Sequence, residues 1–381
     1  MRTLGITLGA VLSVLTVSIA QASETFVPEV LTVQERINPG PNVFVLDQSW
    51  KGASRLNVIA EEDLAHKGNV SMGITAQMTL SQDRKTAYTI SAYAKRISYG
   101  PTEAVLQEFD VETLTLKREI IISDKMALVA PSHAIFNLSA DEKLAFVQNA
   151  TPATSVTVVN LEKGEVVAEI PNPGCFGTFP AQTGYRFSSL CGDGTVQTFE
   201  VTADGEFGAP QRSAKLFDPD ADALYVMPER VGKDLLFPSF KGNLYRIDDS
   251  GKAATLKEIY KVSEGVEGNW APGGVDVLAY NKAHNVAFLT MHGDAKEGTH
   301  KDYSQEIWAY DLKAKKVLYR SVVEGAGAIA VTQGKEPVLF GLIDDTNLVR
   351  YEVDPTARFA VKPSHTLESV GGWSVFAIAG E

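Results

Sequence analysis

The chain of 381 residues has only two cysteines, Cys175 and Cys191, and its six histidines are scattered. It lacks a nucleophile elbow, a glycine-rich phosphate loop, paired zinc-binding cysteines and a dinucleotide fingerprint. The sequence therefore offers no convincing catalytic constellation, and we predict no catalytic residue in this chain. A fold without internal chemistry is most often a platform that binds something.

Basic residues are fewer than acidic ones: the chain has 35 Lys and Arg and 47 Asp and Glu, which gives a net charge of −12. Nucleic acids and anionic membranes repel an acidic surface, so we expect neither as a partner. A cationic protein is the kind of partner that this charge favours. No segment after the first 22 residues is long and apolar enough to cross a bilayer.

The first residues have the pattern of a cleavable secretion signal. Residues 4–19 form an uncharged apolar stretch after Arg2, and Ala20-Gln21-Ala22 fits the small-x-small site of signal peptidase. An uncleaved anchor is the alternative. We expect a signal peptide at residues 1–22 and an extended N-terminal arm at 23–37. Removal of Arg2 changes the net charge of the mature, exported chain from −12 to −13.

The two cysteines lie in the exported part of the chain. An oxidising compartment favours a disulfide between Cys175 and Cys191, which would close a loop of about 15 residues and contribute about 3 kcal/mol. The residues between them indicate a turn followed by a strand, so the bridge would join two neighbouring strands of the fourth repeat. Two separate buried thiols are the alternative.

A two-strand unit recurs along almost the whole chain. Each copy has a turn rich in Asp, Gly, Lys or Asn, then alternating apolar residues, then a second strand that usually ends in Asp or Asn. The copies begin near Val43, Ala87, Ala145, Phe187, Leu236, Ala287 and Val338, at intervals of 44, 58, 42, 49, 51 and 51 residues. A period of about 40–50 residues that carries several strands is typical of β-propeller blades. The sequence therefore predicts an all-β fold, a seven-bladed β-propeller with four-stranded antiparallel blades over residues 38–381.

The ends of a propeller must be joined, because an open ring exposes a sheet edge. Residues 373–379 resemble a strand without a blade of its own, so we predict that they complete the first blade. Residues 29–36 are the alternative. Helical signal is weak, with single turns expected at 61–66 and 262–268.

One pair of histidines lies close in sequence. His292 and His300, with Asp294 and Glu297, contain the residue types of a metal site. Their spacing is not tight, and the segment joins two strands. We therefore interpret it as a solvated loop and predict no metal.

Several segments resemble the heavy subunit of the tryptophan tryptophylquinone amine dehydrogenases of bacterial periplasms. The segments that carry this resemblance are Asn42–Asp47, residues 96–100, residues 270–274, Cys175 and residues 191–194. Residues 149–155, 296–301 and 306–308 resemble the aromatic amine branch more than the methylamine branch. Together, in this order and with this period, they indicate a subunit of a periplasmic aromatic amine dehydrogenase.

The resemblance implies where the chemistry lies. In such enzymes two heavy propellers and two small disulfide-rich light subunits form an α2β2 heterotetramer, and the quinone cofactor and catalytic base belong to the light subunit. The enzyme converts primary amines to aldehyde and ammonia and passes electrons to a small copper protein, azurin- or amicyanin-like. This chain would then supply scaffold and part of the substrate entrance, and would bind no cofactor itself.

One residue receives a role from the resemblance. The family has an aromatic side chain at the mouth of the substrate channel, shortly after the Asp that ends the first strand, and Trp50 follows Asp47 here. An indole there would narrow the channel and stack on an aromatic amine. A light-chain contact or loop packing is the alternative for Trp50. The loop is shorter than usual for the family, and residues 101–104 depart from its pattern, which bears on the identity of the substrate.

Three other functions remain open from the sequence. They are a methylamine dehydrogenase heavy subunit, a stand-alone periplasmic binding propeller, and a metal-dependent propeller hydrolase such as a lactonase. The last would need ligands that converge on the central channel, whereas the acidic residues mostly end strands or lie in outer turns.

Overall fold

The computed structural model describes residues 33–97 and 99–380. The chain divides into two units, Met1–Glu35 and Arg36–Glu381, and the fold below is that of the second. The predicted signal peptide and most of the predicted arm lie outside the described residues. Among those residues, no helix has the length and apolar character needed to span a membrane.

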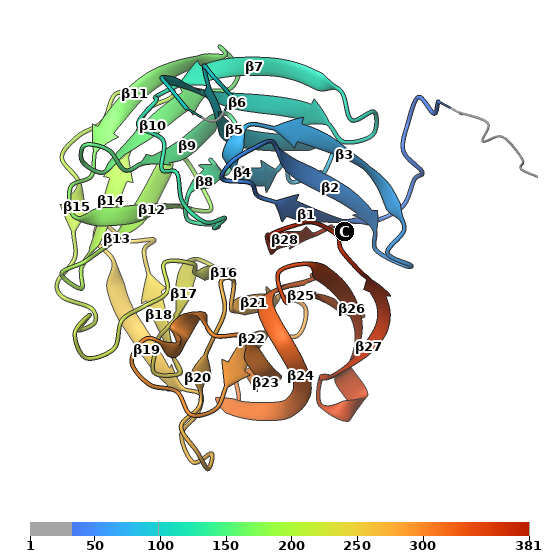
Figure 1. Ribbon diagram of the computed structural model, residues 1–381. Helices are drawn as coiled ribbons and strands as arrows, with labels where there is room; N and C mark the ends of the chain where they lie inside the picture. The colour runs from blue at the N-terminus through green and yellow to red at the C-terminus, as the bar shows by residue number, and fades with distance from the viewer. Residues whose placement is uncertain (1–32, 98, 381) are drawn as a thin grey trace, which may run out of the picture. The chain divides into compact units, whose positions relative to one another are not determined.

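The second unit consists of antiparallel sheets that follow one another around a central axis (Figure 1). The first sheet has the order β28-β1-β2-β3, with β1 (Asn42–Asp47), β2 (Ser54–Ala60), β3 (His66–Met72) and β28 (Ser374–Ala379). β28 pairs with β1 from Val43 to Asp47, and Figure 1 shows the two strands side by side. The prediction that the C-terminal strand completes the first blade is therefore confirmed.

The next two sheets show the sequence repeat most clearly. Their strands are β4 (Ile74–Leu80), β5 (Thr86–Ala94), β6 (Thr102–Asp110), β7 (Leu116–Ile122), β8 (Phe136–Leu138), β9 (Leu144–Asn149), β10 (Ser155–Asn160) and β11 (Glu165–Pro171). The turns β4–β5 and β8–β9 have the same chemistry. Ser81 Oγ donates to Asp83 and accepts from the amide of Thr86, and Ser139 makes the same pair of bonds with Asp141 and Leu144. The polar turn residues of the repeat thus fix the hairpins locally.

The fourth and fifth sheets are also four-stranded. Their strands are β12 (Cys175–Pro180), β13 (Arg186–Cys191), β14 (Val196–Glu200), β15 (Gln211–Arg212), β16 (Glu229–Val231), β17 (Asp234–Pro238), β18 (Asn243–Asp248) and β19 (Thr255–Lys261). The sequence pattern predicts strands of the fifth sheet at 234–239, 242–248 and 254–260, and β17, β18 and β19 lie within one residue of these positions. The short inner strand of this sheet, β16, was not predicted.

The last sheet has eight strands, and it makes the predicted count of seven separate blades wrong. Its strands are β20 (Ala271–Pro272), β21 (Leu278–Asn281), β22 (Val286–His292), β23 (Ser304–Asp311), β24 (Lys316–Val331), β25 (Val338–Ile343), β26 (Asn347–Asp354) and β27 (Ala360–Leu367). The described residues therefore form five four-stranded blades and this one larger sheet.

The cause is β24, a strand of 16 residues. The sequence pattern predicts a shorter strand here, over residues 316–321. It pairs with β23 mainly up to Val322 and with β25 from Ala326 onward, so one strand belongs to both halves of the sheet. Gly325 lies between the two parts with a φ of +82°, a conformation that favours glycine. A Cβ atom there would lie 2.6 Å from Asp344 Oδ1.

The hydrophobic core is divided into clusters that lie between consecutive sheets. Phe44 of β1 shares a cluster with Met78 of β4, and Phe288 of β22 shares one with Leu339 of β25, so the two halves of the large sheet also pack face to face. Middle strands therefore bury both faces, and all six residues of β9 are buried. A strand buried on both faces has no side that faces solvent, so its sequence is a run of apolar and small or amide side chains rather than a strict alternation.

Helices are nearly absent from the described residues, where only two short 3₁₀ helices occur, η1 (Thr299–Lys301) and η2 (Pro355–Ala357). The prediction of single helical turns at 61–66 and 262–268 is wrong, since neither segment is helical. The two segments contain non-helical turns and bends instead, and His66 begins β3.

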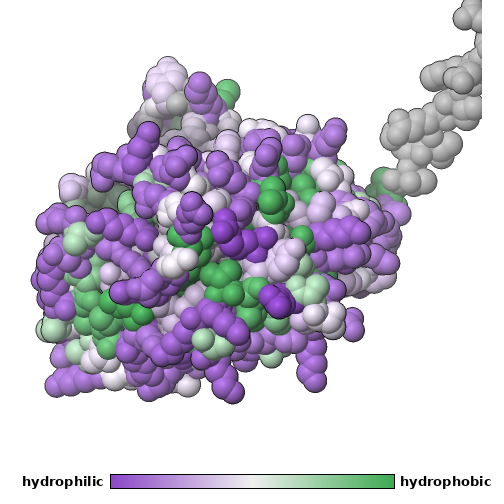
Figure 2. All heavy atoms as spheres, turned by 90° about the horizontal axis from the view of Figure 1, so that it is seen from below, coloured by the Kyte–Doolittle hydropathy of each residue, from purple (hydrophilic) through white to green (hydrophobic). Residues whose placement is uncertain are grey.

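The side of the molecule in Figure 2 is largely hydrophilic, with small groups of hydrophobic residues between the charged ones.

Candidate functional site

The loop after β1 carries Trp50, the residue predicted at a substrate entrance. Ser49 fixes the loop, because its Oγ accepts the amide of Gly52 at 2.9 Å and its own amide donates to Ser54 Oγ at 3.0 Å. Within this short loop Trp50 projects outward, and 51% of its surface is exposed. An indole so exposed is available to a ligand or a partner chain.

Trp50 contacts a second tryptophan that the sequence analysis did not single out. The ring centroids of Trp50 and Trp373 are 6.2 Å apart at an interplanar angle of 52°. Trp373 directly precedes β28, and its amide donates to Asp47 Oδ1 at 3.0 Å, as does that of Gly372 at 2.9 Å. Arg55 also pairs with Asp47 at 3.0 Å. The segment that closes the ring thus positions Trp50, and Asp47 joins that segment to β2 through Arg55.

Further exposed apolar side chains lie at the same end of the sheets. The amide of Thr75, at the start of β4, donates to the carbonyl of Ser49 at 2.8 Å, and β4 starts opposite the end of β5. The β5–β6 connection therefore lies at the end that carries Trp50. We call the exposed residues Trp50, Tyr93, Ile97 and Tyr99 the aromatic rim; Ile97 is 85% exposed and Tyr99 65%.

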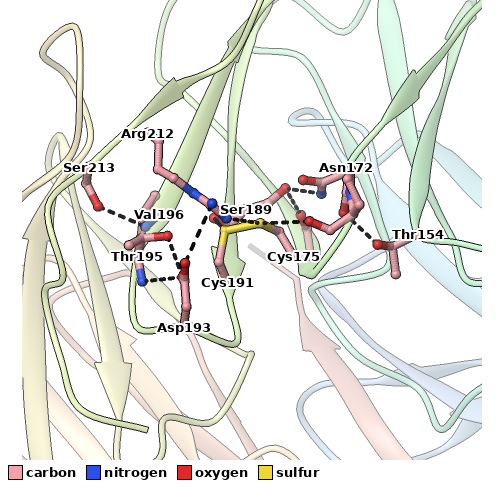
Figure 3. The surroundings of a disulfide bond; sticks show 12 residues. Thr154, Asn172, Cys175, Ser189, Cys191, Asp193, Thr195, Val196, Arg212 and Ser213 are labelled. Atoms are coloured by element: carbon pink, nitrogen blue, oxygen red, sulfur yellow. Dashed lines mark hydrogen bonds and ion pairs between the residues drawn. A yellow bond between two sulfur atoms is a disulfide. The ribbon is translucent and has the colours of Figure 1, made fainter.

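The predicted disulfide is confirmed. Cys175 of β12 and Cys191 of β13 are direct register partners, and their sulfur atoms are 2.02 Å apart (Figure 3). Figure 3 shows Arg212 beside the bridge, where its Nη2 lies 3.7 Å from Cys175 Sγ and its Nη1 3.6 Å from Asp193. Both cysteines are buried, so the bridge joins the two strands as a structural element.

The segment with His292 and His300 is not a simple solvated loop. His292 ends β22 and is buried, with its Nδ1 3.0 Å from the carbonyl of Gly293. His300 stacks on Phe240 with ring centroids 4.2 Å apart, and its carbonyl lies 2.7 Å from the hydroxyl of Tyr225. Among residues 33–97 and 99–380, no group of three His, Cys, Asp or Glu side chains is arranged to hold a metal.

Ionisable side chains line a cavity of 710 Å³, which we call the axial pocket. His133, which precedes β8, and Glu229 of β16 line it, and His133 Nε2 lies 2.9 Å from Asp276 Oδ2, which precedes β21. Phe376 of β28 contacts the His133 ring edge-on, with centroids 4.5 Å apart. The β4–β5, β8–β9 and β21–β22 turns also line the pocket, which therefore opens at the end opposite the aromatic rim.

The enclosure of the axial pocket changes its acid–base properties. Burial by itself would lower the pKa of His133. The Asp276 carboxylate has the opposite and larger effect, and Glu229 adds to it, so the pKa of His133 is raised to about 9. Burial raises the pKa of Glu229 to about 7, although the charge of His133 opposes the rise. The His133 side chain keeps 36% exposure, so water reaches a group that the protein surrounds.

The sequence analysis missed the axial pocket for a structural reason. His133, Glu229 and Asp276 lie at or just before the inner strands β8, β16 and β21, which have three, three and four residues. Such strands are too short to show an apolar alternation. The one available signal was a polar residue at or just before the inner strand in several copies of the repeat.

The described residues thus form a propeller-type scaffold with the exposed aromatic rim at one end and the axial pocket at the other. The sequence matches the family described as methylamine dehydrogenase heavy chain over residues 41–357. This chain belongs to that family. It is 27% identical to the methylamine dehydrogenase heavy chain of Methylobacillus flagellatus over 280 residues, which are 72% of this chain and 69% of that protein.

Other comparisons agree on the family and on the fold. The methylamine dehydrogenase heavy chain of Methylophilus methylotrophus is 25% identical over 311 residues, 80% of this chain and 75% of that protein. The periplasmic gluconolactonase of Pseudomonas aeruginosa superposes with a TM-score of 0.59 at 14% identity and covers 90% of this chain and 99% of its own. At this identity the similarity concerns the fold alone.

Proposed function

We propose that this chain is the non-catalytic heavy subunit of a periplasmic quinoprotein amine dehydrogenase. The observation that carries the proposal is the family match over residues 41–357. The tryptophan tryptophylquinone and the catalytic base belong to a light subunit in an α2β2 heterotetramer, and a small copper protein accepts the electrons. Asp47 accepts from the amides of Gly372 and Trp373 and pairs with Arg55, and these contacts hold the segment before β28 against the loop that carries Trp50.

The aromatic rim is the surface that we propose for the light subunit. It contains the residue expected at the substrate entrance, and protein interfaces are enriched in aromatic residues at their centre. Its exposed side chains extend from the first sheet to the β5–β6 connection of the second. The acidic charge of the chain would suit a cationic surface on a partner.

Assembly through the aromatic rim is tested by one charge substitution. We expect Ile97→Asp to weaken co-purification with a co-expressed light subunit by about tenfold or more, because a desolvated carboxylate in the interface would be unpaired. Val322→Asp is the matched control, since Val322 is 77% exposed but lies on β24. Equal loss of the complex in both variants, or in neither, would contradict the proposed surface.

Two amine classes are candidates for the substrate. The exposed Trp50–Trp373 pair favours aromatic amines, which can stack on an indole. Methylamine is the second candidate, because the relatives named above are methylamine dehydrogenase heavy chains.

The size of the side chain at position 50 separates these candidates. In the assembled enzyme we expect Trp50→Ala to lower kcat/KM for an aromatic amine about tenfold, a loss of about 1.4 kcal/mol, and to change methylamine oxidation far less. Tyr319→Ala is the control, since Tyr319 is 44% exposed on the outer face of β24. Unchanged selectivity in Trp50→Ala would remove Trp50 from the entrance and with it the argument for aromatic amines.

A further inference from the structure

The charges around the axial pocket do not balance within the chain. The ionisable side chains that face Glu229 are His133, Asp276, Arg230, Asp249, Tyr280, Lys282 and Glu142. His133 pairs with Asp276, and Arg230 pairs with Asp249 at 2.6 Å. The charges of Lys282 and Glu142 are opposite and cancel, and the Tyr280 phenol is neutral. Ionised Glu229 therefore contributes one negative charge without a counter-ion.

Glu229 is half-buried and lines the pocket. Within the part of the chain that is described, its carboxylate has no hydrogen bond and no ion pair. Asp276 is 2% exposed and pairs with His133 through its Oδ2, so its charge is already engaged. Glu229, which lines the pocket, thus has unused acceptor capacity, which suits a ligand that brings positive charge and N–H donors.

We propose that the axial pocket binds a small organic cation with N–H donors, of the class of protonated primary amines, with Glu229 as its counter-ion. The Glu229 oxygens accept hydrogen bonds from the ammonium group. The side chains of Phe179 and Leu235, which also line the pocket, contact the alkyl part. Every group involved belongs to this chain, so the site is independent of a light subunit and of the proposed role of Trp50.

A proton and the cation compete for Glu229. Burial is the main cause that raises the pKa of Glu229 to about 7, with Asp276 adding to it and His133 opposing it. The carboxyl is therefore largely neutral at about pH 6 and largely ionised at about pH 8, which makes the cation bind about tenfold more tightly at the higher pH. His133 has a pKa of about 9 and keeps most of its charge over this interval.

Calorimetric titration of the full chain with methylammonium chloride tests the proposal. At about pH 8 we expect a dissociation constant of about 1–10 mM, as befits one ion pair in a polar pocket, and about tenfold weaker binding at about pH 6. Potassium chloride and tetramethylammonium chloride at equal ionic strength should bind far more weakly, since neither has N–H donors. No methylammonium binding at about pH 8, or equal binding of the three salts, would overturn the proposal.

Glu229→Gln keeps the size of the side chain and removes its charge. We expect this variant to bind methylammonium at least about tenfold more weakly and to lose the dependence on pH. Glu142→Gln at the pocket rim is the matched control and should retain both. Unchanged affinity in Glu229→Gln would refute the assignment, and the pH comparison in the unmodified chain decides the matter if that variant fails to fold.

Discussion

A chain that ends at Gly372 is expected to lose the folded propeller unit. The truncation removes β28, so that β1 loses its pairing from Val43 to Asp47 and exposes a sheet edge. It also removes Phe376 from the cluster between the first and second sheets and Ala377 from the cluster between the first sheet and β25. Loss of the far-ultraviolet strand signal and aggregation during size-exclusion chromatography are the expected results.

A single substitution tests the packing of β28 without removing the strand. Phe376 is among the largest fully buried side chains, so Phe376→Ala should lower the free energy of unfolding by about 3–5 kcal/mol. Ile378→Ala is the control on the same strand, and because Ile378 is only half-buried we expect a clearly smaller loss. A truncated chain that remains monomeric and melts like the full one would show that ring closure is not needed for the fold.

The sequence repeat predicted the three outer strands of the fifth sheet well, because the polar turns of the repeat mark where each strand begins and ends. The hairpins of β5 and β9 are fixed by nearby Ser and Asp side chains, which is local chemistry that a sequence displays. The predicted count of blades failed at β24, where pairing with both β23 and β25 is decided by residues distant in sequence. No residue near Ser321 marks the continuation, and only Gly325 hints at the bend.

The candidate sites show the same division. The disulfide between Cys175 and Cys191 was predictable because a chain that is predicted to be exported and has two cysteines offers one pairing. The contact of Trp50 with Trp373 joins residues more than 300 positions apart and depends on ring closure. The axial pocket needs the three-dimensional meeting of β8, β16 and β21, which no local pattern encodes.

Amine oxidation is expected to require the light subunit. The proposed division of labour predicts that the purified heavy chain has no visible quinone absorbance and no amine dehydrogenase activity, because the proposal assigns both the quinone and the catalytic base to the light subunit. Addition of the mature light subunit should restore activity in an all-or-none manner, with a change in kcat of many orders of magnitude. Reconstitution with the Trp50→Ala chain should retain the absorbance, since that side chain acts on substrate entry alone.

The measurement that tests the central claim most directly compares the isolated chain with the co-expressed complex under identical conditions. Visible absorbance and the amine-dependent reduction of a small copper protein are recorded for both samples. Our account predicts quinone absorbance and turnover in the complex and neither in the isolated chain. Quinone absorbance or amine oxidation by this chain alone would contradict it.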